Sequence, residues 1–176
     1  MTGRIALFID GINLHQTARN LGFEIDYKRL LSEFERFGSI VRPYFYSAIR
    51  EGEVSSVRHL TDWLDSNGFT VRTKSIKHYE DEGKRSRRSI GVDLAVDALE
   101  IAPRIDDIFL FSGDGDFRAL VETVQRLGVR VTVVSSVQTT PAMASDELRR
   151  QADAFLELAT LRRSIERQTR RPSGEA

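Results

Sequence analysis

The stretch DDIFLFSGDGDFRALVETVQRLG (residues 106–128) joins a short apolar run, an acidic turn and a segment with helical periodicity. The apolar run is followed by Asp114 and Asp116, with a glycine on either side of Asp114. The segment RIALFID (4–10) has the same form, because its apolar run ends in Asp10. Two segments that resemble buried strands and that both end in a carboxylate indicate one shared site.

Segments typical of strands alternate with segments of helical periodicity along the rest of the chain. Strands are expected at 4–10, 39–49, 69–76, 106–112 and 128–136. Helices are expected at 26–38, 53–68, 92–103, 116–128 and 146–158, followed by C-terminal helical cover at 159–168. Because such alternation requires right-handed crossovers, it predicts an α/β three-layer sandwich of Rossmann-like type, with a mostly parallel sheet of about five strands.

Length and composition favour one ordinary domain. We expect the domain to occupy residues 1–160, and residues 161–176 to form a basic C-terminal helical extension with a frayed tail. The formal net charge is +0, although residues 74–89 are rich in Lys and Arg. With no cysteine, thiolate metal sites and a cysteine nucleophile are excluded. No apolar run is long enough for a bilayer and no signal peptide is evident, so no membrane partner and a cytoplasmic location are expected.

The acidic residues are expected to meet at one edge of the sheet. Ligands of open parallel sheets bind beyond the carboxyl ends of the strands, where the strand order reverses. In the order 3-2-1-4-5, Asp10 and Asp114 would end neighbouring central strands. The segment IGVDLAVDALE adds Asp93, expected in the first turn of a helix, and Asp97 one turn later on the same face. Neither Lys nor Arg adjoins these acids in the sequence, so they need another compensating charge.

A divalent cation would compensate these carboxylates, because Mg²⁺ and Mn²⁺ prefer oxygen ligands. Asp10, Asp93 and Asp114 are the expected ligands, with Asp97 and Asp116 as secondary ligands. Such an ion would orient a phosphodiester, polarise it and activate a water. The alternative is that each aspartate caps a helix or forms a turn, which is a serious rival for Asp116 directly before a helix.

Three ordered motifs carry a resemblance to a known family. LFIDGINL (7–14), IGVDLAVDALEIA (90–102) and FLFSGDGDFRALVETVQRLGVRVTVVS (109–135) resemble the NYN domains, in particular their LabA-like branch. These domains are related to PIN-domain nucleases, and the resemblance extends over about residues 4–158. It implies a PIN-like α/β fold and a ribonuclease-type site that uses Mg²⁺ or Mn²⁺.

The resemblance also assigns positions. The family's catalytic residues fall on Asp10, Asn13, Asp93, Asp114 and Asp116. Ser112 matches the family's serine and is expected to hydrogen-bond a carboxylate or a phosphate. Many relatives carry Lys where this chain has Ile90, which leaves Arg87 or Arg88 as a substitute phosphate contact. Arg118 is a further expected contact to the nucleic-acid backbone.

The sequence therefore predicts a metal-dependent ribonuclease that cleaves RNA phosphodiester bonds. The alternative is a non-catalytic RNA- or protein-binding regulatory module that keeps a metal pocket. Beyond RNA, a homodimer or a protein partner could use the C-terminal helix. Haloacid-dehalogenase phosphatases are disfavoured, because Ile12 stands where they need a second acid, and response-regulator receivers are disfavoured, because the chain lacks their paired early acids and late lysine.

Overall fold

The computed structural model describes residues 3–50, 56–76 and 80–168, with the side chains of 50, 76 and 80–89 left out of the description. Six strands form one sheet in the order β3-β2-β1-β4-β5-β6, and all neighbours are parallel. The strands are β1 (Arg4–Asp10), β2 (Ser39–Arg50), β3 (Thr70–Ile76), β4 (Asp107–Phe111), β5 (Arg130–Ser135) and β6 (Ala154–Glu157). The predicted α/β fold and the order 3-2-1-4-5 are confirmed, and β6 adds one strand at the edge.

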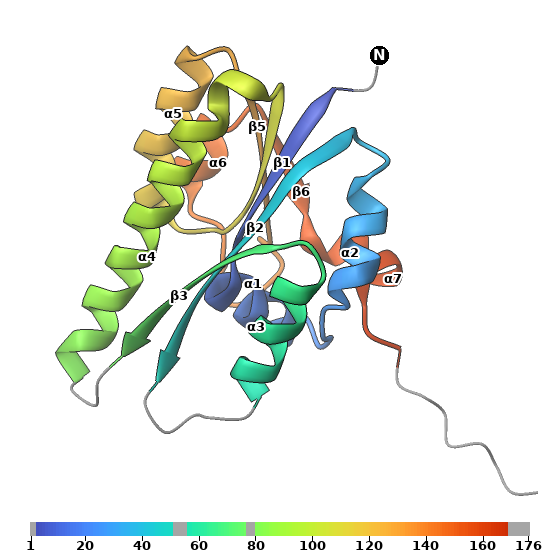
Figure 1. The fold of residues 1–176 in the computed structure, drawn as a ribbon, viewed down its shortest axis with the longest axis vertical. Helices are drawn as coiled ribbons and strands as arrows, with labels where there is room; N and C mark the ends of the chain where they lie inside the picture. Colours follow the sequence, from blue (N-terminus) through green and yellow to red (C-terminus); the bar gives the residue numbers. More distant parts are fainter. Residues whose placement is uncertain (1–2, 51–55, 77–79, 169–176) are drawn as a thin grey trace, which may run out of the picture.

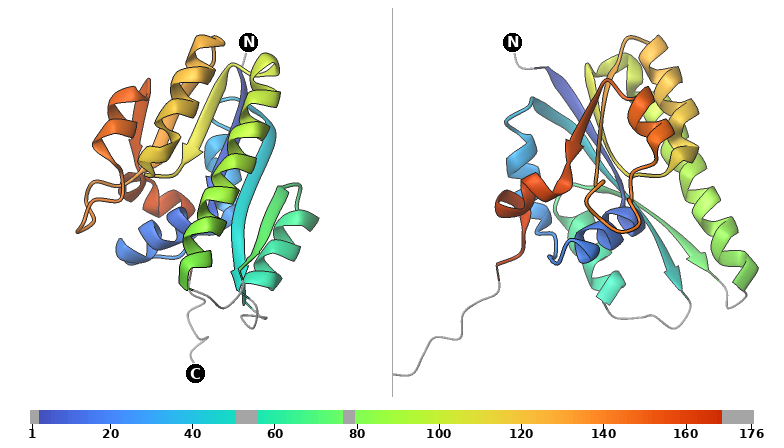
Figure 2. Two further views of the ribbon diagram at one scale, coloured as in Figure 1. Left: turned by 90° about the vertical axis from the view of Figure 1, so that its left-hand side faces the viewer. Right: turned by 180° about the vertical axis from the view of Figure 1, so that it is seen from behind.

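Helices cover both faces of this sheet, as Figures 1 and 2 show. The helices are α1 (Gly11–Asn20), α2 (Tyr27–Phe34), α3 (Ser56–Ser66), α4 (Glu80–Ile101), α5 (Arg118–Arg126), α6 (Asp146–Gln151) and α7 (Leu158–Ile165). Two short 3-10 helices, η1 (Ala102–Arg104) and η2 (Gly115–Phe117), follow α4 and precede α5. Helices α4, α5 and α6 pack on one face, while α1, α2, α3 and α7 pack on the other.

Alternation along β1 divides the buried side chains between two cores. Ile5, Leu7 and Ile9 belong to the core under α1, α2, α3 and α7. Ala6 and Phe8 belong to the core under α4 and α5. Because side chains of a strand point alternately to the two faces, Asp10 continues the second set. The last residue of β1 is thereby aimed at the α4 and α5 side of the sheet.

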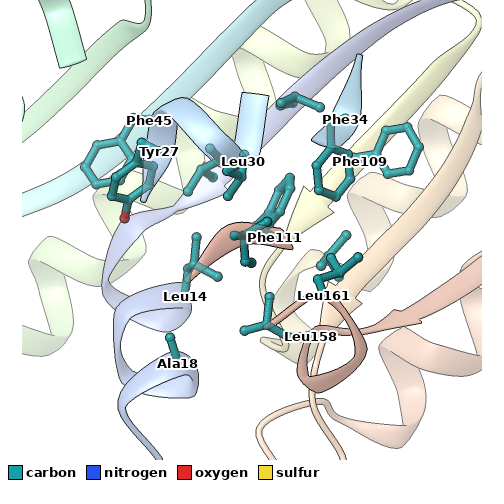
Figure 3. Close-up of a cluster of buried hydrophobic side chains, with 14 of the residues drawn as sticks. Leu14, Ala18, Tyr27, Leu30, Phe34, Phe45, Phe109, Phe111, Leu158 and Leu161 are labelled. Carbon is teal, nitrogen blue, oxygen red and sulfur yellow. The ribbon is translucent and has the colours of Figure 1, made fainter. Parts of the chain in front are cut away.

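Aromatic rings fill the first of these cores, shown in Figure 3. The Phe34 ring lies 5.0 Å from Phe109 and 4.9 Å from Phe111, measured between centroids. Leu158 and Leu161 of α7 complete the same cluster. Each fully buried side chain of this size contributes about 1.5–3 kcal/mol, so the core depends on a helix close to the C-terminus.

Several element boundaries differ from those expected. Helix α1 was not expected. The helix expected over 146–158 is instead α6 followed by β6, because Ala152 turns to extended backbone and residues 154–157 pair with β5. Helix α4 begins at Glu80, so Asp93 lies in its interior and not in its first turn.

The C-terminal helix is a part of the core. Helix α7 crosses the expected domain boundary at residue 160, and its Leu161 and Ile165 are buried. Arg29 of α2 donates hydrogen bonds to the backbone oxygens of Arg163 and Glu166. Helix α7 is therefore not the exposed extension that was expected, because its apolar face is used within the chain, and a partner at this helix stays a prediction. Across the described ranges, none of the helices has the length and apolar character that spanning a membrane requires.

Candidate active site

The carboxyl ends of β1 and β4 bring the two acidic motifs together. These strands are neighbours, with Ile9 opposite Phe111. Strand order reverses between them, since β2 lies beyond β1 while β5 lies beyond β4. This is the place where open parallel sheets bind ligands. Asp10 and Asp114 therefore meet at the predicted position.

Ser112 connects the two aspartates. Its hydroxyl donates to Asp10 Oδ2 at 3.0 Å and accepts from the backbone N–H of Asp114 at 3.2 Å. The serine is fully buried. It therefore contacts a carboxylate of the protein, and it holds the end of β1 and the turn after β4 as one unit.

Both aspartates also cap short helices. Asp10 Oδ1 accepts from the backbone N–H of Asn13 at 3.2 Å, at the start of α1. Asp114 Oδ1 accepts from the backbone N–H of Asp116 at 3.0 Å, at the start of η2. The capping role considered for Asp116 belongs to Asp114, and Phe117 at the start of α5 makes no side-chain cap. An ionised carboxylate has about four lone-pair sites, so a capping aspartate can still bind a ligand.

Asn13 ties α1 to the acidic turn. Its Oδ1 accepts from the backbone N–H of Gly113 at 3.0 Å. Because a backbone N–H can only donate, this bond fixes which end of the amide is oxygen. The Nδ2 group makes no hydrogen bond to another described residue. Asn13 also lines a pocket between α1, α4 and α5. The amide can therefore donate to a ligand while its oxygen positions the turn.

A loop after β5 supports the acidic turn from behind, which sequence reasoning missed. A Cβ at Gly113 would collide with the backbone oxygen of Met143 and lie 2.8 Å from Ala144 Cα. The backbone N–H of Ser145 donates to Gly113 O at 2.9 Å. Gly113 is thus required by this close approach, and the glycine before Asp114 is the sequence signal that could have indicated it.

A pocket of about 480 Å³ opens beside these residues, between α1, α4 and α5. Its polar residues include Asp10, Asn13, Asp114 and Asp116. Its apolar residues include Ile12, Ile90, Val92, Ala95, Leu99, Phe117 and Leu120. The site therefore combines carboxylates with a large apolar wall.

Asp97 lies outside this pocket, within a buried hydrogen-bond network. Its Oδ2 accepts from the Tyr46 hydroxyl at 2.7 Å and from Arg72 Nε at 3.2 Å, and its Oδ1 accepts from Arg72 Nη2 at 3.1 Å. Burial, followed by the hydrogen bond to Asp97, raises the pKa of Tyr46. The hydrogen bond to Asp97 likewise raises the pKa of Arg72. Asp97 is buried, does not line the pocket and is already paired with the charge of Arg72, which argues against the expected role as a secondary metal ligand.

Asp93 also pairs with a basic residue. Lys74 Nζ lies 2.9 Å from Asp93 Oδ2, and Asp93 does not line the pocket. The expectation that no Lys or Arg compensates Asp93 and Asp97 is wrong, because β3 brings Lys74 and Arg72 to the face under α4. These two basic side chains lie close to the aspartates in the folded protein, although they are distant from them along the sequence.

The donors that remain at the pocket fit a hard cation with few protein ligands. In the described part of the chain, no group of three or more His, Asp or Glu side chains is placed to hold a metal ion. Mg²⁺ is commonly held by one or two carboxylates, with water in its remaining positions. Asp10 and Asp114, which Ser112 links, offer one or two such carboxylates, and Asn13 and Asp116 line the same pocket.

The expected substrate contacts have different surroundings. Arg118 is half-exposed and lies 3.7 Å from Glu122 on the next turn of α5. Arg87 and Arg88 lie in the part of α4 whose side chains are outside the description. Ile90 is buried and forms part of the pocket wall, so this position presents an apolar side chain to the site.

Comparisons with known proteins agree with this fold and cover the whole site. The family model of the NYN domain matches residues 4–159. The chain is 35% identical over 175 residues to the Low amplitude and bright protein LabA of Synechococcus elongatus, covering 96% of this chain and 90% of that protein. The crystal structure of a protein of unknown function from Vibrio parahaemolyticus superimposes with a TM-score of 0.73 at 28% identity, covering 89% of this chain and 93% of that one.

Proposed function

The chain belongs to the NYN domain family, and from this we propose that it is a metal-dependent ribonuclease that cleaves RNA phosphodiester bonds. The observation that carries the proposal is the unit formed by Asp10, Ser112 and Asp114. It joins two acidic strand ends and faces a pocket. A purely structural pair of helix caps would need neither the link between the strands nor a cavity beside it.

The residues at the pocket have distinct roles in this proposal. Asp10 and Asp114 hold a Mg²⁺ or Mn²⁺ ion, and Asp116 on η2 completes its acidic surroundings. When bound, the ion supplies charge stabilisation at the phosphate and lowers the pKa of water. Asn13 donates from its amide nitrogen to the scissile phosphate or to a water. Asp93 joins the ligands only when it leaves Lys74, which lies 2.9 Å away.

Basic residues near the site are proposed to bind the flanking backbone of the RNA. Arg118, at the start of α5, has a side chain that is 49% exposed, so it can exchange Glu122 for a phosphate. Arg87 and Arg88 remain candidates from the sequence. Because Lys and Arg contacts to phosphates release counterions, affinity should fall as salt rises.

Hydrolysis of single-stranded RNA in Mn²⁺ tests the proposal. Asp10→Asn and Asp114→Asn remove a charge but keep a residue that caps helices equally well, so folding is preserved. We expect each variant to lose about 100-fold or more in rate. Asp62→Asn, an exposed aspartate on α3, is the matched control and should match wild type. Equal rates for wild type and the double variant would overturn the site assignment.

The alternative function is a non-catalytic RNA- or protein-binding regulatory module that keeps a metal pocket. The pairing of Asp93 with Lys74 and of Asp97 with Arg72 favours it, since two expected acids are already neutralised. Such a module would keep its RNA affinity in EDTA and produce no fragments with Mg²⁺ or Mn²⁺. Fragments that depend on Asp10 would exclude it.

A further inference from the structure

The pocket extends from the carboxylates into an apolar groove between α4 and α5. Val92, Ala95 and Leu99 line it from α4, and Ala119 and Leu120 line it from α5. Val92 and Leu99 are 61% and 39% exposed, although both are large apolar side chains. Contiguous apolar surface in a concave site is typical of a place that a ligand covers.

The two ends of the groove differ in chemistry, and this restricts what can occupy it. One end holds Asp10, Asp114 and Asp116, and the walls beyond it are mainly aliphatic. A ligand that occupies both ends of the groove needs an apolar or flat portion for the aliphatic walls and an anionic portion for the acidic end. A cation would offset the repulsion between that anion and the carboxylates. A nucleotide has this form, because its base has apolar faces and its phosphate is the anion.

Polar groups along the groove suit the edge of a base. Gln16 of α1 lines the pocket, and its side-chain amide makes no hydrogen bond to another described residue. Its amide both donates and accepts, so it can pair with the edge of any base. Thr123 of α5 also lines the pocket, but its hydroxyl already donates to Ala119 O at 2.8 Å. Recognition therefore rests mainly on the apolar walls, with one adaptable amide.

We infer that this groove is a subsite for one unstacked nucleobase of single-stranded RNA, next to the phosphate bound at Asp10 and Asp114. The inference rests on the proposed function. A base within a duplex is covered by its neighbours on both faces, so it cannot enter a groove between two helices without leaving the stack. Contact through aliphatic walls gives little discrimination between bases.

A second copy of the chain fits the groove less well. In a symmetric dimer the same patch meets itself, so an interface across this groove would bring two sets of Asp10, Asp114 and Asp116 towards one another. Like charges facing each other across an interface oppose association. An RNA strand with its bound cation meets no such repulsion.

Binding of RNA to a blocked groove tests the inference. The probe is a fluorescent single-stranded RNA of about eight uridines, with Ca²⁺ in place of Mg²⁺ and gels run to check that it stays intact. Ala95→Trp fills the groove, and Val96→Trp on the next residue of α4, which is 57% exposed and outside the groove, is the matched control. We expect Ala95→Trp to weaken binding about tenfold and Val96→Trp to leave it within about twofold. Leu99→Gln, at an exposed position of the groove, makes the wall polar without adding a charge and should likewise weaken binding, so it is a second variant if Ala95→Trp does not fold.

An abasic nucleotide moved along the same RNA locates the base. We expect one abasic position to weaken binding to wild type about tenfold, and to have no effect on binding to Ala95→Trp. Equal effects of Ala95→Trp and Val96→Trp, or no sensitive abasic position, would overturn the subsite. A wild-type dimer that Ala95→Trp converts to a monomer would also overturn it. If the protein cleaves RNA but no abasic position weakens binding, the subsite is contradicted and the ribonuclease proposal is not. If one abasic position weakens binding but no cleavage occurs, the ribonuclease proposal is contradicted and the subsite is not.

Discussion

Single aspartates that look alike in the sequence have different surroundings in the fold. Asp97 is 6% exposed and is held by Tyr46 and Arg72 beneath α4. Asp10 ends a central strand beside a pocket. Arg72 is half-exposed, but Asp97 is not, so an Asp97 carboxylate that lost its partners would keep a buried charge, which is destabilising. Asp97 is therefore explained by the packing of α4 on the sheet, whereas Asp10 is placed to meet a ligand.

Tyr46→Phe should lower the free energy of unfolding by about 1–3 kcal/mol near neutral pH, since Asp97 loses a hydrogen bond. The pKa of Tyr46 is raised in the folded protein above its ordinary value of 10.0. The protonated form is thus favoured by folding, and its contribution is complete below about pH 10 and is lost as the pH rises above it. Urea unfolding at several pH values should show wild type losing stability more steeply than Tyr46→Phe in alkali. A difference that stays constant with pH would contradict this.

At the scale of elements, the acidic turn depends on a loop that lies far away in the sequence. Gly113 accepts a hydrogen bond from Ser145, and the loop before Ser145 leaves no room for a side chain at Gly113. Gly91 of α4, by contrast, has room for a side chain, because an added Cβ would lie 3.7 Å from Phe117, which is an ordinary van der Waals distance. Two glycines that flank the same pocket should therefore respond differently to substitution.

Gly113→Ala should destabilise the protein by about 1–3 kcal/mol, because its methyl group must displace backbone. The shift should also move Asp114 and weaken the proposed binding of Mn²⁺. Gly91→Ala is the control, and it should raise stability by up to about 1 kcal/mol, since alanine is the better helix former. Thermal unfolding and Mn²⁺ titration check both variants. If the Gly113→Ala protein is as stable as wild type, the loop at Met143 and Ala144 can move to accommodate the added methyl group, and the prediction is contradicted.

The sequence was sufficient for features that depend on neighbours along the chain. The alternation of strands and helices indicated the sheet, and glycine and aspartate at the strand ends indicated its binding edge. It was insufficient where residues meet across the sheet. The pairing of Lys74 with Asp93 and of Arg72 with Asp97 depends on β3 lying beside β2, which no local pattern shows. The strand β6 was missed because four residues in a helical context give little periodicity.

At the scale of the whole molecule, the C-terminal helix closes one of the two cores. Helix α7 contributes buried leucine and isoleucine side chains, and its backbone accepts hydrogen bonds from Arg29. The basic character of this region suggested an extension of the domain. Its basic side chains lie on the outside of a helix whose other face is core.

A chain that ends at residue 160 should therefore be much less stable than one that ends at residue 168. The shorter chain lacks Leu161 and Ile165, and each large core side chain contributes about 2–5 kcal/mol. We expect its melting temperature to be lower by roughly 10 °C or more, if it folds at all. Circular dichroism melts of the two proteins make the measurement. Equal melting temperatures would mean that the domain ends near residue 160.

The bond from Ser112 to Asp10 joins residues 102 positions apart, and the bond from Gly113 to Asn13 joins residues 100 apart. Such distant pairs form only after the intervening chain has been ordered, because closing a long loop costs entropy that local contacts do not repay. Helices, by contrast, need only local contacts. During refolding, the far-ultraviolet signal should therefore return before the proposed binding of Mn²⁺ at Asp10 and Asp114. Metal binding would then report completion of the tertiary structure, which makes it a kinetic probe for the last stage of folding.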